Sequence, residues 1–400
     1  MTAQGHRNGF LRVRGEREHA KVDFVELFFD LVFVFAVTQL SHGLIGHYTL
    51  LGALQTALLL LAVWWVWIYT AWWTNWVDPA RRPVRFILFV LMLAGLVLST
   101  SIPQAFSSRG LAFAGAYVFM QVGRTAAMLW LTARRRPGLN RNFQRVFAWF
   151  VLSGAFWVAG GIADEGARFA LWVLALVLEY AAPAFGFWTP GLGRSTTQEW
   201  NVEPGHMAER CGLFIIIALG ESILVTGATY ADLEITVPTM AAFVVAFVGS
   251  LAMWWIYFDT GARRVGHRFS TSDDPGRLAR IAYTYLHVPL VAGIILGAVA
   301  DEFILMHPGG HDGHTDAGTM AAIIGGPAVF LVGNILFKRT AARWLPLSHL
   351  VGLGLLAPLV PVASAISPLM LAAAATAVLV VVAIWEFVSL RTRESEWAEH

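Results

Sequence analysis

The sequence predicts an all-α polytopic membrane protein, a helical bundle of about twelve transmembrane helices arranged as two parallel six-helix repeats. Three observations predict this class. Apolar residues make up 57% of the 400-residue chain and charged residues only 14%, against about 25% charged residues in a typical soluble domain. Apolar runs of membrane-spanning length recur along the chain, and basic residues gather in every second connection between them. The lipid bilayer is therefore the expected partner of most of the surface.

The expected helices follow from their length. A hydrocarbon core about 30 Å thick requires roughly 20 apolar residues per helix. The expected spans are 24–46, 51–76, 84–106, 111–133, 145–163 and 167–187, then 209–230, 237–260, 280–304, 319–337, 344–362 and 367–390. The first run is long, carries acids and lacks a small-residue cleavage site, so we expect it to remain in the mature protein.

Loop charge sets the expected orientation, because Arg and Lys collect on the cytoplasmic side of membrane proteins. With the N-terminus inside, 25 of the 28 basic residues fall in the inner segments, which are the tails, the inner loops and the inner ends of the adjoining spans. Arg109 and Arg168 lie in outer loops, and Arg124 lies within a span. The sequence thus predicts that both termini are cytoplasmic.

Three short similarities predict an internal duplication. Residues 64–70 read Trp-Trp-Val-Trp-Ile-Tyr-Thr, and 254–260 read Trp-Trp-Ile-Tyr-Phe-Asp-Thr. The other two pairs are 118–124 with 329–334 and 177–180 with 384–387. The expected organisation is a basic tail (1–21), a first repeat (22–190), a linker (191–208), a second repeat (209–391) and a C-terminal tail (392–400). Parallel repeats are typical of some transporters.

Composition and motifs exclude several function classes. The net charge of +2 is too small to indicate a nucleic-acid partner, and the single cysteine, Cys211, excludes an intrachain disulfide. The sequence has no P-loop, dinucleotide fingerprint, CxxC or metalloprotease motif. We therefore predict no cofactor and no metal, and an enzymatic activity is not the expected one.

Two blocks resemble a known family. Residues 22–35 read Val-Asp-Phe-Val-Glu-Leu-Phe-Phe-Asp-Leu-Val-Phe-Val-Phe, and 208–214 read Ala-Glu-Arg-Cys-Gly-Leu-Phe, followed by Leu-Gly-Glu-Ser-Ile-Leu at 219–224. These blocks resemble the bacterial low temperature requirement protein A family (LtrA), with Cys211 in place of the usual aromatic residue. The resemblance covers about residues 20–390. It implies a multi-pass protein of the bacterial cytoplasmic (inner) membrane, whereas the family name records a growth phenotype and no chemistry.

Ionisable residues inside the spans are the main functional candidates, because each costs at least about 2.5–3.5 kcal/mol at a helix centre. Glu26 and Asp30 share one face of the first helix, four residues apart. The set of predicted substrate- or ion-binding residues is Glu26, Asp30, Arg124, Glu179, Glu221 and His287. Asp30, Glu179 and Glu221 are three acids deep in the spans, and Arg124 is the one deep base. We therefore expect a proton or a cation to neutralise the acids that Arg124 does not. Paired charges that only dock helices are the alternative.

Secondary candidates have plainer interpretations beside the functional one. Glu209 and Arg210 are expected at the cytoplasmic start of the seventh helix, as interfacial anchors, with His206 in the loop before them. Asp259 and Glu386 lie near inner helix ends and could be solvated.

Trp65 and Tyr69 belong to an aromatic stripe that core packing explains, the alternative being a cation–π wall for an organic cation. The His-rich outer loop 307–316 carries imidazoles and carboxylates, but its spacing matches no closed metal site, and a solvated loop is favoured.

These features predict a secondary transporter or ion-conducting permease with an intramembrane acidic site. Asp30 and Glu221 would bind a proton or cation, and Arg124 would tune them or meet an anionic group of an unknown small solute. Two alternatives stay open: a membrane-embedded enzyme acting on lipid, and a non-transporting structural or sensory protein. A homo-oligomer is possible.

Overall fold

The computed structural model describes residues 9–12, 21–133, 136–200, 202–262, 275–310, 312–341 and 345–398. The side chains of residues 198, 260–262, 275, 341 and 390–398 are not described. Most of the predicted basic tail, His311 and the end of the predicted C-terminal tail lie outside the described residues. Part of the topology prediction depends on arginines that also lie outside the described residues, namely Arg134, Arg135, Arg263, Arg264, Arg268 and Arg343.

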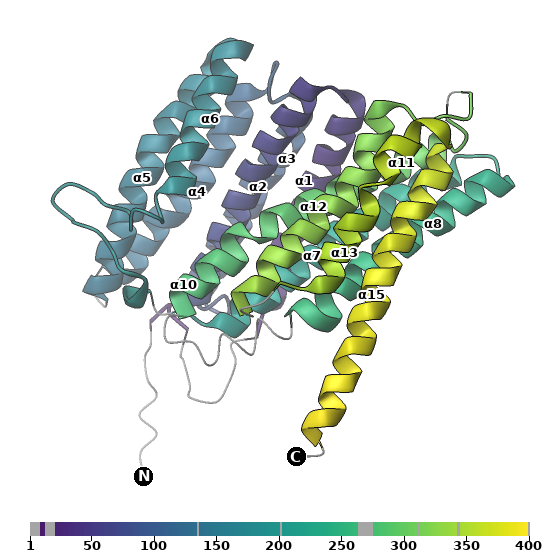
Figure 1. The fold of residues 1–400 in the computed structure, drawn as a ribbon. Coiled ribbons are helices and arrows are strands. Elements are labelled where there is room, and N and C mark those ends of the chain that lie inside the picture. The colour runs from purple at the N-terminus through teal and green to yellow at the C-terminus, as the bar shows by residue number, and fades with distance from the viewer. Residues whose placement is uncertain are drawn as a thin grey trace. The chain divides into compact units, whose positions relative to one another are not determined.

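The first half of the chain forms long helices joined by short loops (Figure 1). They are α1 (Phe24–Gly46), α2 (Leu50–Trp76), α3 (Arg82–Ser101), α4 (Gly110–Thr132), α5 (Pro137–Ile162) and α6 (Glu165–Ala181). Two short 3₁₀ segments, Ile102–Gln104 and Thr197–Glu199, follow α3 and precede α7. Figure 1 shows α4, α5 and α6 side by side, in agreement with the packing of α4 on α5 and of α5 on α6.

The second half repeats this pattern with more interruptions. Its elements are α7 (Pro204–Ala231), α8 (Val237–Trp255), the π-helix η3 (Ile256–Ala262), α10 (Pro275–Ala279), the π-helix η4 (Arg280–Tyr285), α11 (His287–Met306), α12 (Ala317–Ala341), α13 (Leu347–Leu356), α14 (Leu359–Val362), the 3₁₀ turn Ala363–Ala365 and α15 (Pro368–Ala398).

Each of the twelve predicted spans coincides with a helix or with consecutive helical segments, and the described residues contain no strand. The all-α membrane bundle is thus confirmed. Ten helical segments of the described chain are long and apolar enough to cross a membrane. The two predicted spans outside that set are α4, which carries Gln121 and Arg124 in its interior, and α6, which has 17 residues.

Three span boundaries differ from the prediction for identifiable reasons. The short span expected at 145–163 is longer, because Pro137 occupies the first helical position and starts α5 earlier. The span expected at 344–362 divides at Pro358 into α13 and α14. The seventh helix begins at Pro204, so His206 lies in its first turn and not in a loop.

Side-chain caps fix several helix starts. Asp23 Oδ1 accepts a hydrogen bond from Val25 N, and Glu26 Oε2 accepts one from Asp23 N, which together cap α1. Asp164 caps α6 by accepting from Ala167 N. Thr236 caps α8 with a capping box. These caps satisfy backbone N–H groups that a helix start leaves unpaired.

Packing divides the chain into two compact units. The first comprises Met1–Leu40, Leu54–Arg210 and Asp274–Arg277, and the second comprises Ser41–Ala53, Cys211–Asp273 and Leu278–His400. α1 and α7 each contribute residues to both units.

The cores of the units differ in kind. The first is rich in fully buried aromatic residues, among them Trp64, Trp65 and Trp67 of α2. In the second, α11 and α12 approach closely through glycines: a Cβ on Gly293 would lie 2.6 Å from Phe330 N. Small residues at such crossings are typical of membrane helices.

Candidate functional site

Four fully buried ionisable groups of the first unit form two successive contacts between α1 and α7. We call these contacts the α1–α7 ladder: its first step is Glu26–His206 and its second step is Asp30–Arg210. Glu26 and Asp30 lie four residues apart on α1, and His206 and Arg210 lie four apart on α7. His206 Nε2 is 2.9 Å from Glu26 Oε1, and Arg210 Nη2 is 2.9 Å from Asp30 Oδ1. All four residues have no exposed surface. Because residues four apart share a helix face, each helix supplies one partner to each step.

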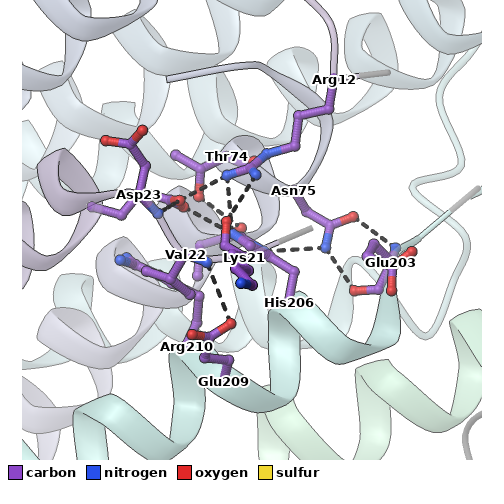
Figure 2. A network of polar contacts seen from close by, with 12 residues as sticks. Arg12, Lys21, Val22, Asp23, Thr74, Asn75, Glu203, His206, Glu209 and Arg210 are labelled. Atoms are coloured by element: carbon purple, nitrogen blue, oxygen red, sulfur yellow. Dashed lines mark hydrogen bonds and ion pairs between the residues drawn. The ribbon is translucent and has the colours of Figure 1, made fainter. Parts of the chain in front are cut away.

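The first step is completed by the N-terminal segment and by α2. Arg12 Nη2 donates to Glu26 Oε2 over 2.7 Å, and Arg12 Nε donates to the carbonyls of Thr74 and Val77. An antiparallel bridge between Leu11 and Val77 holds this segment beside the end of α2. Figure 2 shows the side chains of Arg12 and His206 meeting in this network. Glu26 therefore has a cation and an imidazole on its two oxygens.

Asn75 determines which nitrogen of His206 carries the proton. Its Oδ1 accepts from Glu203 N and its Nδ2 donates to Glu203 O, which fixes the orientation of the amide (Figure 2). Nδ2 then faces His206 Nδ1 at 3.3 Å as a donor. Nδ1 must accept, so the proton of the neutral imidazole is on Nε2, which donates to Glu26 Oε1. Arg12 Nη2 lies 3.2 Å from the same nitrogen but is itself a donor, so in this tautomer that contact is not a hydrogen bond. This tautomer is assigned from the network.

The second step is less complete. Asp30 Oδ1 accepts from Trp67 Nε1 over 2.8 Å, and the Arg210 guanidinium lies 5.5 Å from the centroid of the Trp67 ring. Within the part of the chain that the structure describes, Asp30 Oδ2 and Arg210 Nε and Nη1 are buried without a hydrogen-bond partner. Buried polar atoms in this state are uncommon and call for an explanation.

A second polar cluster occupies α4, α5 and α6. Glu179 Oε1 accepts from Ser153 Oγ over 2.7 Å and from Trp157 Nε1 over 3.0 Å, and Glu179 Oε2 accepts from the Tyr117 hydroxyl. Gln121 joins Tyr117 to Arg124, since Gln121 Nε2 donates to Tyr117 Oη and Arg124 Nη2 donates to Gln121 Oε1.

The polar contacts of Arg124 differ from the predicted contact with the acids. Arg124 Nη1 donates to Val66 O and Thr70 Oγ1 on α2, and Nη2 donates to Gln121. The basic group beside Asp30 is instead Arg210.

Comparisons with known proteins agree with this architecture. A family model described as Bacterial low temperature requirement A protein (LtrA) matches residues 21–384. The chain belongs to the LtrA family. It is also 40% identical over 375 residues to an uncharacterized protein of Rhizobium meliloti (strain 1021), which covers 94% of this chain and 91% of that protein. No solved structure matches.

The interpretation of Arg210 as an interfacial anchor is wrong for this LtrA family member. Arg210 is fully buried on Asp30, because α7 begins one turn earlier than predicted. Its neighbour Glu209 is exposed, and its Oε2 accepts from Val22 N over 3.3 Å. Asn75 and His206 were not among the predicted site residues, although the four-residue spacing of His206 and Arg210 is visible in the sequence.

The aromatic stripe lies in the core of the first unit. Trp65 has no exposed surface and stacks on Tyr180, with 3.9 Å between ring centroids. The Tyr69 ring faces a cation of the chain itself, the Arg124 guanidinium, at 5.7 Å.

The second unit of the LtrA chain holds the remaining predicted residues. Glu221 is 3% exposed on α7. Next to it, Ser222 Oγ donates to Asp301 Oδ2 and contacts Ser250 Oγ. Asp259 is half-buried on the π-helix η3.

His287 is buried in the second unit with contacts at both ring nitrogens. Its Nε2 lies 2.8 Å from the Tyr257 hydroxyl, and its Nδ1 lies 2.8 Å from Ala282 O. Ala282 belongs to the π-helix η4 that precedes α11. A neutral imidazole satisfies both contacts.

One cluster in the second unit was missed from the sequence. Glu386, for which solvation at an inner helix end was one interpretation, is 6% exposed, and Lys338 Nζ donates to its Oε2 over 2.6 Å. His349 Nε2 lies 3.2 Å from the same Nζ, and Ser348 contacts both His349 and Glu386. Lys338 ends an apolar run, and no local pattern indicates that α13 and α15 cover it.

The described residues contain no group of three or more His, Cys, Asp or Glu side chains placed to hold a metal ion. His311 of the His-rich loop lies outside them.

Proposed function

We propose that this LtrA family member is a secondary transporter or ion-conducting permease of the bacterial inner membrane, with the α1–α7 ladder as its site. One observation carries the proposal: a fully buried Asp30–Arg210 pair whose remaining polar atoms lack partners among the described residues. An unsatisfied buried polar group costs about 1–3 kcal/mol. Intramembrane acids and bases of this kind mark ion or substrate pathways in membrane proteins.

The chemistry of the pair suggests how the site would work. Arg210 stays charged, while Asp30 can gain or lose a proton. A proton on Asp30 Oδ2 would weaken its attraction to Arg210 and free the guanidinium for an anionic group of a solute. Loss of that proton would restore the pair. The role that the sequence suggested for Arg124 is therefore assigned to Arg210, and the substrate class is a small solute, a proton or a cation.

The test is flux through the reconstituted protein. Sealed liposomes with a trapped pH indicator receive a pH step, with potassium and valinomycin clamping the voltage. Removing one member of a buried ion pair costs about 3–5 kcal/mol, so single substitutions are compared with the charge-neutral double variant Asp30→Asn/Arg210→Gln. We expect the double variant to fold and to lose at least about tenfold in flux, the equivalent of 1.4 kcal/mol.

Asp232→Asn is the matched control, because it removes a carboxylate from an exposed loop between α7 and α8. It should conduct like the wild type. Glu221→Gln tests the predicted acid of the second unit in the same assay. Wild-type liposomes no more permeable than empty ones, or a folded double variant with wild-type flux, would remove the ladder from transport.

A structural or sensory role is the second candidate, because two of the buried acids are well satisfied. Glu26 accepts from Arg12, Asp23 N and His206, and Glu179 accepts from three donors. In that case the wild type would carry no flux, and the single variants would lower only the unfolding temperature.

A further inference from the structure

Glu179 is bonded on both oxygens by neutral side chains. Tyr117 donates to Oε2, and Ser153 and Trp157 donate to Oε1, so no cation among the described residues is hydrogen-bonded to this carboxylate. Glu179 is 2% exposed, and Tyr117, Ser153 and Trp157 are fully buried. A charge in such a position is costly unless something compensates it.

The compensation comes through a hydrogen-bond chain whose direction is fixed. A guanidinium only donates, so the atom of Gln121 that meets Arg124 must be the oxygen. Gln121 Nε2 therefore points to Tyr117 Oη and donates to it. The Tyr117 hydroxyl is left to donate its own hydrogen to Glu179 Oε2. Each link polarises the next, so Arg124 favours the deprotonated state of Glu179 although the two do not touch.

The other oxygen has a place for a proton. Ser153 Oγ lies 2.7 Å from Glu179 Oε1 and 3.3 Å from Phe150 O. When Glu179 is ionised, the serine hydroxyl donates to Oε1. When Oε1 carries a proton, the hydroxyl can rotate to donate to Phe150 O and accept the proton's hydrogen bond. Both protonation states are satisfied without moving a helix.

We propose that Glu179 is a reversible proton-binding site and that Arg124 keeps it deprotonated from a distance through Gln121 and Tyr117. Arg124, Gln121 and Tyr117 are positioning residues, and Ser153 is the residue that switches its hydrogen bond. The inference goes beyond the transport proposal and does not depend on it, since proton binding at Glu179 needs no gradient.

Among the described residues, the further ionisable groups beside the hydrogen-bond chain from Arg124 to Glu179 are two tyrosines. Tyr180 lies next to Glu179 on α6, and Tyr69 of α2 lies under Arg124. α5 contributes Ser153 and Trp157, which do not ionise in the pH range in which a carboxyl group titrates. The Tyr180 hydroxyl donates to Leu61 O, outside the chain of four residues.

Infrared difference spectroscopy of the full-length protein in lipid tests the proposal. The carbonyl band of a protonated carboxyl group is followed from alkaline to acid pH, and Glu179→Gln identifies the band of Glu179. In Tyr117→Phe and Arg124→Gln we expect this band to appear at a pH higher by about one to two units, because the ionised carboxylate loses the hydrogen bond from Tyr117 or the polarisation of that bond by Arg124. Gln121→Leu should shift the pH at which the band appears in the same direction. In the double variant Tyr117→Phe/Gln121→Leu the shift should equal that of Tyr117→Phe, because the first substitution already interrupts the hydrogen-bond chain.

Tyr180→Phe is the matched control, because it removes a neighbouring hydroxyl outside the chain. It should leave the midpoint unchanged. If Tyr117→Phe does not fold, Gln121→Leu interrupts the same chain elsewhere. A Glu179 band that never appears on acidification refutes the proton site. A midpoint that is equal in wild type, Tyr117→Phe and Gln121→Leu refutes the control by Arg124.

Discussion

At the scale of single residues, two uncharged amides fix the direction of the hydrogen bonds made by their ionisable neighbours. Gln121 transmits the direction of the Arg124 hydrogen bond to Tyr117. Asn75, held by both backbone groups of Glu203, assigns the proton of His206 to Nε2. Neither amide carries a charge, yet each fixes which atom of its neighbour can donate. Such residues escape a sequence search that looks for ionisable groups inside spans.

Substitution of Asn75 tests this at the ladder. Asn75→Leu keeps the approximate shape but removes the donor to His206 and both contacts with the Glu203 backbone. We expect the free energy of unfolding to fall by about 1–3 kcal/mol, because partly buried polar groups lose their partners. Thermal or denaturant unfolding in detergent measures it. Gln55→Leu, at a half-buried position of α2 where the amide makes a long 3.4 Å contact with Glu165 Oε1, should change the value by less than about 0.5 kcal/mol. Equal effects of the two variants would contradict the role of Asn75.

At the scale of elements, side-chain caps define the start of several helices of this chain. Asp316 precedes α12 and accepts from the backbone of Gly318 and Thr319 and from the Thr319 hydroxyl. Partial burial would raise the pKa of Asp316, but these hydrogen bonds outweigh it and hold the pKa below its ordinary value. The cap is therefore strongest when the residue is ionised.

The sign of the pH effect follows. Because the pKa is lower in the folded state, the carboxylate adds stability above its unfolded pKa of about 3.9, and this is lost as pH falls through the lower folded value. Acidification should lower the unfolding temperature of the wild type more than that of Asp316→Asn, since asparagine caps helices without titrating. Unfolding scans at neutral and acid pH measure the difference. Parallel decreases in the two proteins would show that Asp316 does not contribute.

At the scale of the whole molecule, the two six-helix groups share a pattern that supports the proposed duplication. Glu179 lies on the sixth helix of the first group and takes partners from the fourth and fifth, α4 and α5. Glu386 lies on the last helix of the second group and takes partners from α12 and α13, which hold the corresponding places. The duplication itself stays a proposal.

The orientation of the chain can be tested with its single cysteine removed. In a Cys211→Ala background, we expect Arg194→Cys, in a predicted inner loop, to react with a membrane-impermeant maleimide only after the cells are opened. Glu234→Cys, in a predicted outer loop, should react in intact cells. The physical reason is the concentration of basic residues in the inner loops. The reverse labelling pattern would show that the protein has the opposite orientation in the membrane.

The sequence predicts helices better than it predicts contacts. Length and apolarity suffice for the spans, because the bilayer imposes one element on each long apolar run. The partner of Asp30 was not predictable from local pattern, since Arg210 is 180 residues away and the start of α7 depends on Pro204. Lys338 and Glu386 were missed for the same reason: their burial is decided by tertiary packing.

The matched intervals on α1 and α7 make chain length itself a constraint. One residue inserted between Glu26 and Asp30, or between His206 and Arg210, would turn the rest of the helix by about 100°. Only one of the two contacts, Glu26–His206 or Asp30–Arg210, could then form, and the charged residues of the other contact would be buried without their partner. Insertions and deletions should therefore be tolerated in the loops of this protein but not within these two intervals, even where the inserted residue is itself an excellent helix former.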